Sequence, residues 1–209
     1  MGGCCGGSCG TGGGGTGGPG GSAFHRVLRQ SFVINALTAA VLLWAGMRLE
    51  SAALMAGALG FVAGALNYGA SLAMVRLGPG HGVGGVAVNT LVKNAVLALA
   101  SVGVMAEAVT NAAAGVIPDA APVSLLALAG LGIAVTLAVL LFAGRRGGVS
   151  ARAVWLCARR DALAMAAVIA AAAGVWLGDV VWPDTAVALG LAGMTAAGLL
   201  GPRRLNHPA

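Results

Sequence analysis

Six long apolar runs limit what this chain can fold into more than any other feature. Each approaches or exceeds the roughly 20 residues that a helix needs to cross a bilayer. They lie at residues 31–47, 52–75, 86–106, 123–143, 153–177 and 185–200. Alanine and leucine are the main residues of these runs, and polar and apolar residues do not alternate, so membrane-spanning strands are not expected. The runs predict an all-α membrane protein with six transmembrane helices.

The composition excludes an ordinary soluble domain. Charged residues make up 9% of the chain and apolar residues 58%, whereas a soluble domain carries about 25% charged residues. So few polar side chains could not cover a water-facing surface. We therefore divide the chain into a flexible Gly/Cys-rich cytoplasmic tail (1–24), a six-span domain (25–201) and a short cytoplasmic tail (202–209).

The charged residues fall on alternate sides of the predicted spans. With a cytoplasmic N-terminus, the inner segments contain Arg26, Arg29, Arg76, Arg145, Arg146, Arg152, Arg203 and Arg204. The outer loops contain Glu50, Glu107, Asp119, Asp179 and Asp184, with Arg48 the only basic residue. This positive-inside pattern predicts two cytoplasmic termini in a multi-pass protein of the cytoplasmic (inner) membrane. Because the net charge of +6 follows from topology, the expected partner is the lipid bilayer and not a nucleic acid.

Three cysteines lie in the glycine-rich tail, at Cys4, Cys5 and Cys9. Thiolates are good ligands for Zn²⁺ and Cu⁺, and the reducing cytoplasm disfavours a disulfide, so the tail could bind metal. A second interpretation is that the cysteines are incidental to a low-complexity tether. Lipidation is a weaker alternative, because myristoylation prefers Ser or Thr at the sixth position, where this chain has Gly6.

Asp161 is the only carboxylate well inside a predicted span, which makes it a functional candidate. Cys157 precedes it by four residues and so lies on the same helix face, where a thiol and a carboxylate could bind one cation. Alternatively, Asp161 neutralises Arg159, Arg160 or Lys93 near the cytoplasmic interface. Spacing alone favours this second interpretation and leaves the first open.

Other polar residues in the spans are expected to have structural roles. Lys93 should extend its side chain to the cytoplasmic interface, and Asn35, Thr38, Asn67 and Tyr68 should form hydrogen bonds between helices. The sequence contains no Ser/His/Asp set, no phosphate-binding loop before a helix and no HExxH motif. An enzyme is therefore not expected.

Three stretches carry a family resemblance. Residues 51–72 read SAALMAGALGFVAGALNYGASL, residues 154–168 read VWLCARRDALAMAAV, and Trp182-Pro183-Asp184 precedes the last span. The first resembles the second span of the cation diffusion facilitator (cation efflux) family. The second is similar to that family's fifth span with its His/Asp-x-x-x-Asp pair, and the third to the start of its sixth helix. The resemblance covers about residues 25–200.

This resemblance implies proton-coupled export of a divalent cation such as Zn²⁺ by alternating access, in a homodimer or in a pair with a paralogue. The ion site would lie between the second and fifth spans, with Cys157 and Asp161 at the fifth-span ligand positions. The second-span ligand positions fall on Gly57, Gly60 and Gly64, which offer no side-chain ligand. Since Zn²⁺ usually takes four ligands, this implied metal site is degenerate.

Alternative functions therefore stay open at this point. A cation exporter with an altered site would use Asp161 and Cys157, and the tail cysteines would capture the ion. A transport-inactive relative would act as an interaction partner or scaffold, and a transporter of another small solute is a third option. No cofactor is expected beyond the transported cation. Only a few residues follow the sixth span, so the family's cytosolic C-terminal domain is not expected.

Overall fold

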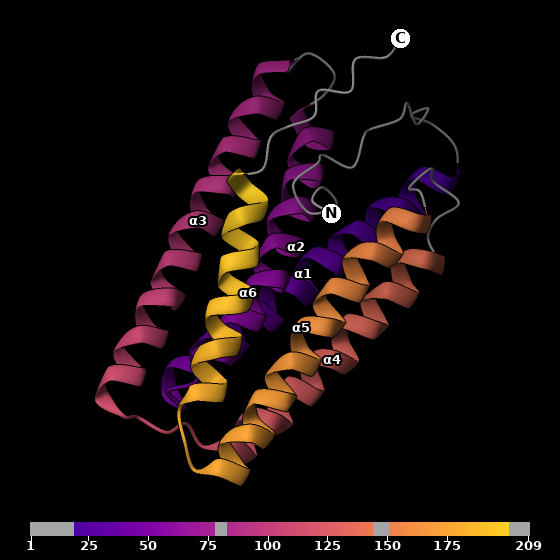
Figure 1. Ribbon diagram of the computed structural model, residues 1–209. Helices are drawn as coiled ribbons and strands as arrows, with labels where there is room; N and C mark the ends of the chain where they lie inside the picture. Colours follow the sequence, from indigo (N-terminus) through magenta and orange to yellow (C-terminus); the bar gives the residue numbers. More distant parts are fainter. Residues whose placement is uncertain (1–18, 78–82, 144–150, 201–209) are drawn as a thin grey trace.

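The computed structural model describes residues 19–77, 83–143 and 151–200, which form six helices and no strands (Figure 1). The helices are α1 (Pro19–Arg48), α2 (Ala52–Leu77), α3 (Val83–Ala114), α4 (Ala120–Ala143), α5 (Ala151–Gly178) and α6 (Trp182–Leu200). Each predicted span lies within one of them, so the expected all-α bundle is confirmed. Pro19 suits the start of α1, because its fixed φ fits a first turn. Residues 19–24, which the sequence assigns to the tail, are helical.

Five of these helices contain a run that is long and apolar enough to cross a membrane. The runs are Arg29–Arg48, Ala52–Ala70, Leu91–Ala114, Ala120–Val139 and Arg160–Gly178. The remaining helix, α6, has 19 residues and is the shortest. Its apolar run is shorter still, because Trp182, Pro183 and Asp184 precede the run in its first turn. It is nevertheless packed into the bundle beside α2 and α3.

Tight connections join the helices at one end of the bundle. Between α1 and α2, the Ser51 N–H donates to the Gly46 carbonyl at 3.0 Å, and Glu50 has a φ of 54°. Gly115, with a φ of 67°, follows α3, and Asp179, with a φ of 49°, lies between α5 and α6. A left-handed residue at the end of a helix turns the chain sharply. Consecutive helices in these pairs therefore run in opposite directions.

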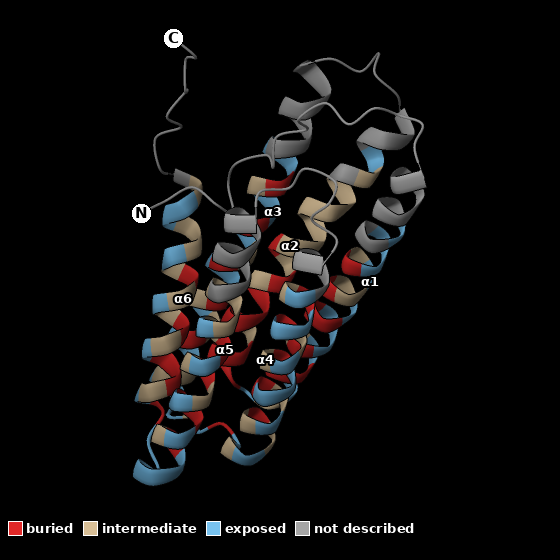
Figure 2. Cartoon of the chain, turned by 90° about the vertical axis from the view of Figure 1, so that its right-hand side faces the viewer, coloured by how far each residue is buried: buried red, intermediate tan, exposed pale blue. Residues whose placement is uncertain are grey.

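Helix α2 lies at the centre of the bundle. Leu54 and Phe61 belong to an apolar core that α2 shares with α1, α4 and α5, whereas Ala56 and Leu59 belong to a second core shared with α3 and α6. Half of the apolar run of α2 is buried, a larger share than in the other four runs. Figure 2 shows buried residues on the inner helix faces and exposed residues outside. Side chains that face α2 consequently lie deep in the protein.

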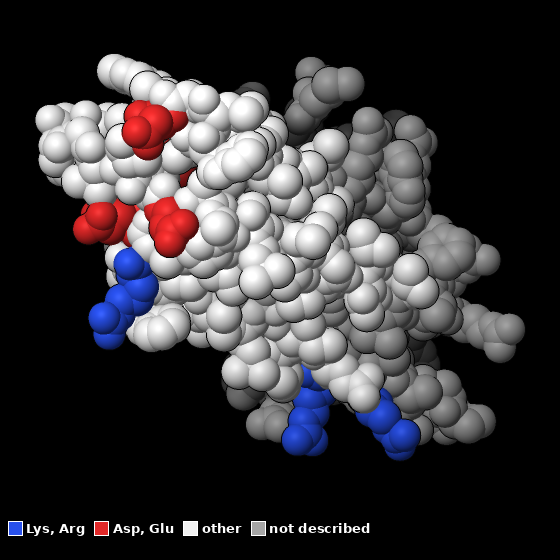
Figure 3. All heavy atoms as spheres, turned by 90° about the horizontal axis from the view of Figure 1, so that it is seen from below, with Lys and Arg blue, Asp and Glu red and all other residues white. Residues whose placement is uncertain are grey.

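Among the described residues, exposed acidic side chains lie at one end of the bundle and exposed basic ones mostly at the other, with Arg48 the exception, as the sequence predicts. Glu50, Asp119 and Asp179 are exposed in the tight connections, and acidic side chains gather over that end in Figure 3. Arg26 and Arg29 are exposed near the start of α1, at the other end. The structure does not describe the side chains of the other arginines that the sequence places on the cytoplasmic side: Arg76, Arg145, Arg146, Arg152, Arg203 and Arg204.

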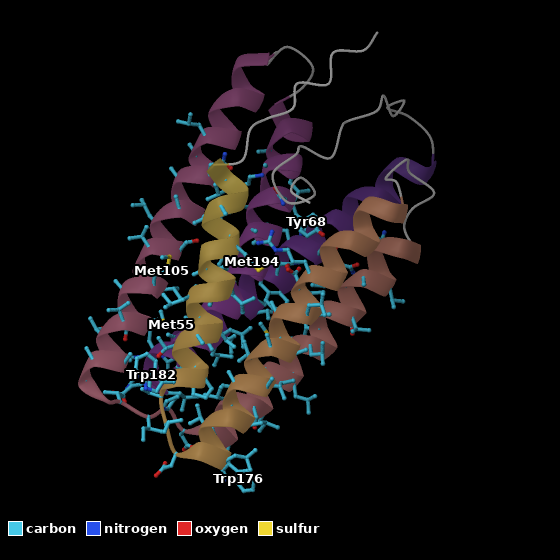
Figure 4. The ribbon with its side chains drawn as sticks, viewed as in Figure 1. Met55, Tyr68, Met105, Trp176, Trp182 and Met194 are labelled. Atoms are coloured by element: carbon cyan, nitrogen blue, oxygen red, sulfur yellow. The ribbon has the colours of Figure 1, made fainter. Side chains whose placement is uncertain are left out.

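Tryptophans mark the acidic end of the bundle. Trp176 and Trp182 are exposed where α5 ends and α6 begins (Figure 4). Trp44 is exposed near the end of α1, and the Arg48 guanidinium carbon lies 5.5 Å from the centroid of a Trp44 ring. Tryptophan is enriched where a membrane meets water. These rings therefore agree with a membrane–water interface at this end.

Candidate cation site between α2 and α5

Glycines form a stripe along one face of α2, and polar side chains pack directly against it. The stripe consists of Gly57, Gly60 and Gly64. A Cβ atom at Gly60 would lie 2.5 Å from Asp161 Oδ1 of α5, and one at Gly64 would lie 2.5 Å from Asn35 Oδ1 of α1. Non-bonded atoms do not approach a Cβ this closely, so α2 can come this near its neighbours only because these residues are glycine.

The third glycine is packed in the same way by an apolar side chain. The Met165 methyl group of α5 occupies the place of a Cβ at Gly57. Met165 is fully buried, and its sulfur lies 2.7 Å from where a Cβ would be at Gly130 of α4. A flexible methionine is well suited to fill the irregular space between two glycines. The glycine stripe is thus closely packed and does not leave vacant ligand positions.

Asp161 lies where the resemblance places the fifth-span ligand. Its carboxylate is half-buried and meets α2 at Gly60. The preceding residue, Arg160, reaches toward α6 and donates a hydrogen bond to Thr195 Oγ1 at 3.2 Å. This contact gives Arg160 a role apart from neutralising Asp161, which was one alternative from the sequence. Arg159 and Cys157 are also in α5, but the structure does not describe their side chains.

Asn35 adds an oxygen atom beside the glycine stripe, and Ser31 lies one helical turn before it on α1. Asn35 is buried, and its Nδ2 donates to the Ser31 carbonyl oxygen at 2.8 Å while its Oδ1 faces Gly64. The hydroxyl of Ser31 is completely buried and has no hydrogen-bond partner among the described residues. A buried hydroxyl without a partner is rare, because it loses its bonds to water. It therefore marks a place where a polar ligand would be favourable.

Lys93 is buried, contrary to the expectation that it reaches the membrane interface. Only 7% of the residue is exposed, and its Nζ donates to Asn67 Oδ1 of α2 at 2.9 Å. The physical reason is that α3 begins at Val83, ten residues before Lys93, so that about 15 Å of helix separates the lysine from the start of α3. The expected hydrogen bond between helices at Asn67 is confirmed.

The sequence-predicted metal ligands are only partly within the described part of the chain. Among the described residues, no group of three or more His, Cys, Asp or Glu side chains could hold a metal ion. Cys4, Cys5 and Cys9 lie outside those residues, and of Cys157 only the backbone is described. The structure brings Asp161 to the second helix, and its role as a ligand stays a prediction.

Comparison with known proteins decides the family. A sequence model of the cation efflux transmembrane domain matches residues 28–201. The chain belongs to the cation efflux family. The match extends from α1 to the residue after α6, so this cation efflux domain is an integral, multi-pass membrane protein. No curated protein matches the chain. Members of the family are transporters and not enzymes.

Asp184 is a structurally important residue whose position differs from the one that the sequence pattern predicts. It was expected in an outer loop, but it is 97% buried in the first turn of α6 (3% exposed). Its carboxylate accepts hydrogen bonds from the Ser51 hydroxyl at 2.7 Å and from the Ala53 N–H at 3.1 Å. Ser51 Oγ in turn accepts from the Leu54 N–H at 3.2 Å. Asp184 therefore caps the start of α2 from a distant part of the chain.

Burial raises the pKa of the Asp184 carboxyl, and the hydrogen bonds from Ser51, Ala53 and Ala52 oppose this rise. A signal for this role was present in the sequence. Ser51 stands immediately before the first helical residue of α2, where a cap is expected, and Asp184 follows Pro183 at the start of α6. Their pairing across 133 residues could not be seen without the fold.

Replacing Asp184 with alanine should destabilise the bundle strongly. The change leaves the Ser51 hydroxyl and the Ala53 N–H buried without their acceptor, which should cost about 2–4 kcal/mol. Thermal unfolding of the purified protein in detergent measures this loss. Asp119→Ala is the matched control, because Asp119 is exposed and caps only its own helix through the Ala121 N–H at 3.3 Å. Equal unfolding temperatures for the two variants would contradict a special role for Asp184.

Proposed function

We propose that this cation efflux protein exports a divalent heavy-metal cation of the zinc type in exchange for protons. The observation that carries the proposal is the position of Asp161, whose carboxylate meets α2 at Gly60 in the interior of the bundle. A carboxylate within membrane-spanning helices is costly and is usually kept for function. The family match supports cation export, and the choice of zinc rests on the residues around Asp161.

The proposed ligand set combines oxygen and sulfur atoms. Asp161 supplies the carboxylate, and Cys157, one helical turn away on α5, supplies a thiolate. Asn35 Oδ1, which faces the next turn of the glycine stripe, is a candidate oxygen donor. Carboxylate and thiolate groups suit Zn²⁺. This set should bind Zn²⁺ less tightly than four strong ligands would. Weaker binding suits a transporter, which must release its ion, better than a storage protein.

Proton exchange follows from the chemistry of these ligands. A thiol must lose its proton to bind a metal, and a neutral carboxyl must also ionise, so binding of the cation releases protons and proton return releases the cation. We further propose that the protein works as a homodimer or pairs with a paralogue, as the family resemblance implies. The cysteines Cys4, Cys5 and Cys9 would raise the local cation concentration on the cytoplasmic side.

Flux into liposomes that contain the full-length protein tests this function. With a zinc-sensitive dye inside, the protein should increase Zn²⁺ entry several-fold over protein-free liposomes. An acidic lumen should accelerate entry, because protons leave as zinc enters, and a protonophore should remove this acceleration. A rate of zinc entry that does not change with the pH gradient would contradict proton exchange.

Replacing the three tail cysteines with serine should slow zinc entry only at low zinc concentration. An unchanged rate at low zinc would contradict capture of the cation by the tail.

A second candidate function is that of a transport-inactive partner or scaffold. The observation that favours it is the close packing of all three glycines, which leaves no side-chain ligand on α2 at these positions. Such a protein would insert and fold normally in liposomes but would conduct no Zn²⁺, Cd²⁺, Co²⁺ or Ni²⁺. Protein-dependent flux of any of these cations would exclude this role as the main one.

A further inference from the structure

Lys93 and Asp161 contact the same face of α2 at two different positions along the helix axis. Asp161 meets α2 at Gly60, and Lys93 bonds to Asn67, seven residues further along the helix. Seven residues correspond to two turns on one face and about 10 Å along the axis. Asn35 faces Gly64 between them. Because α2 runs from the acidic end of the bundle toward the end where α1 begins, Lys93 lies on the cytoplasmic side of Asp161.

The lysine places its amino group inside this part of the bundle and not in water. Its side chain is 93% buried and bonded to an amide oxygen of α2, whereas a lysine near a helix end would extend into water. Tyr68 follows Asn67 on α2 (Figure 4), so a second polar side chain lies next to Asn67. Charges in a low-dielectric interior interact over distances at which water would screen them.

We propose that Lys93 sets the affinity and charge selectivity of the cation site, as a tethered cation on the cytoplasmic route to Asp161. The inference rests on the proposed function, in which Asp161 binds the transported ion. The ammonium repels an arriving cation, and it repels a divalent ion twice as strongly as a monovalent one. A transport site must bind its ion weakly enough to release it. Lys93 therefore keeps binding of divalent cations weak.

Equilibrium binding of Cd²⁺ and Ag⁺ tests this role, because both ions bind thiolates and differ in charge. It is measured on the purified full-length protein with Cys4, Cys5 and Cys9 replaced by serine, so that the tail thiols do not bind the ions. Lys93→Met, which removes the charge and keeps the length of the side chain, should tighten Cd²⁺ binding at least about tenfold and Ag⁺ binding clearly less. Lys93→Gln should act in the same direction. Lys93→Arg should restore the Cd²⁺/Ag⁺ ratio of the unaltered protein. Arg48→Met, which removes an exposed charge at the outer end, is the control and should leave the ratio unchanged.

A purely structural role for Lys93 would not change the ratio between two ions. An unchanged ratio in folded Lys93→Met protein overturns the proposal, and so does failure of both neutral variants to fold while Lys93→Arg folds, because the charge would then serve stability. Because binding is measured without transport, a result can contradict the role of Lys93 and leave zinc export standing, or contradict zinc export and leave the role of Lys93 standing. Tighter Cd²⁺ binding in Lys93→Met, in a protein that moves no zinc, supports the role of Lys93 and contradicts export.

Discussion

Replacing Asp161 with asparagine should reduce zinc flux in liposomes at least about a hundredfold. Loss of a group that only supports a metal ligand costs roughly 10–100-fold in affinity or activity, and loss of a ligand itself should cost no less. Asparagine keeps the shape of the side chain against Gly60, where Asp161 Oδ1 now packs. The change therefore removes the charge and leaves the contact between α5 and α2 in place.

The matched control for this prediction is Asp119→Asn. It removes one negative charge from an exposed connection at the acidic end of the bundle, so its flux should stay close to that of the unaltered protein. Unfolding temperatures of both variants show whether lost flux reflects lost structure. Zinc flux through folded Asp161→Asn protein at more than a tenth of the normal rate would assign Asp161 to structure, as the sequence alone favours.

Much of the fold could be predicted because the bilayer fixes the length of a spanning helix. The six apolar runs therefore fell within the six described helices. Asp161 was found by the same logic, since a carboxylate in an apolar run is conspicuous. Lys93 was misplaced because α3 starts at Val83, three residues before the predicted run, and because the sequence does not show which way a long side chain turns.

Contacts between residues that are distant in the sequence could not be predicted in the same way. The sequence identifies Gly60 and Gly64 as residues without ligands, but it does not show that Asp161 and Asn35 pack against them. The burial of Asp184 was also hidden, because a polar residue just before a span usually belongs to a loop. Each of these contacts joins helices that are separated in the chain, and their positions depend on how α2 packs between its two cores.

The packing of the glycine stripe predicts that adding an acidic ligand to α2 will not restore a metal site. Gly60→Asp, which introduces an acid at a family ligand position, should abolish export and destabilise the protein instead of improving it. Its Cβ would lie 2.5 Å from Asp161 Oδ1 and 3.2 Å from Asp161 Cγ, so α2 and α5 must separate. Overpacking of this kind costs about 1–3 kcal/mol, and two adjacent carboxylates repel each other in addition.

Two glycine-to-alanine variants separate the effects of volume and charge. Gly60→Ala adds only the Cβ and should lose stability by the packing cost, whereas Gly132→Ala should not, because nothing lies within 4 Å of a Cβ there. Thermal unfolding with and without Zn²⁺ measures the difference. If Zn²⁺ raised the unfolding temperature of Gly60→Asp above that of the unaltered protein, α2 could retreat and a two-carboxylate site could form. We expect no such rise, because the same close approach that brings Asp161 to α2 leaves no room for a second carboxylate.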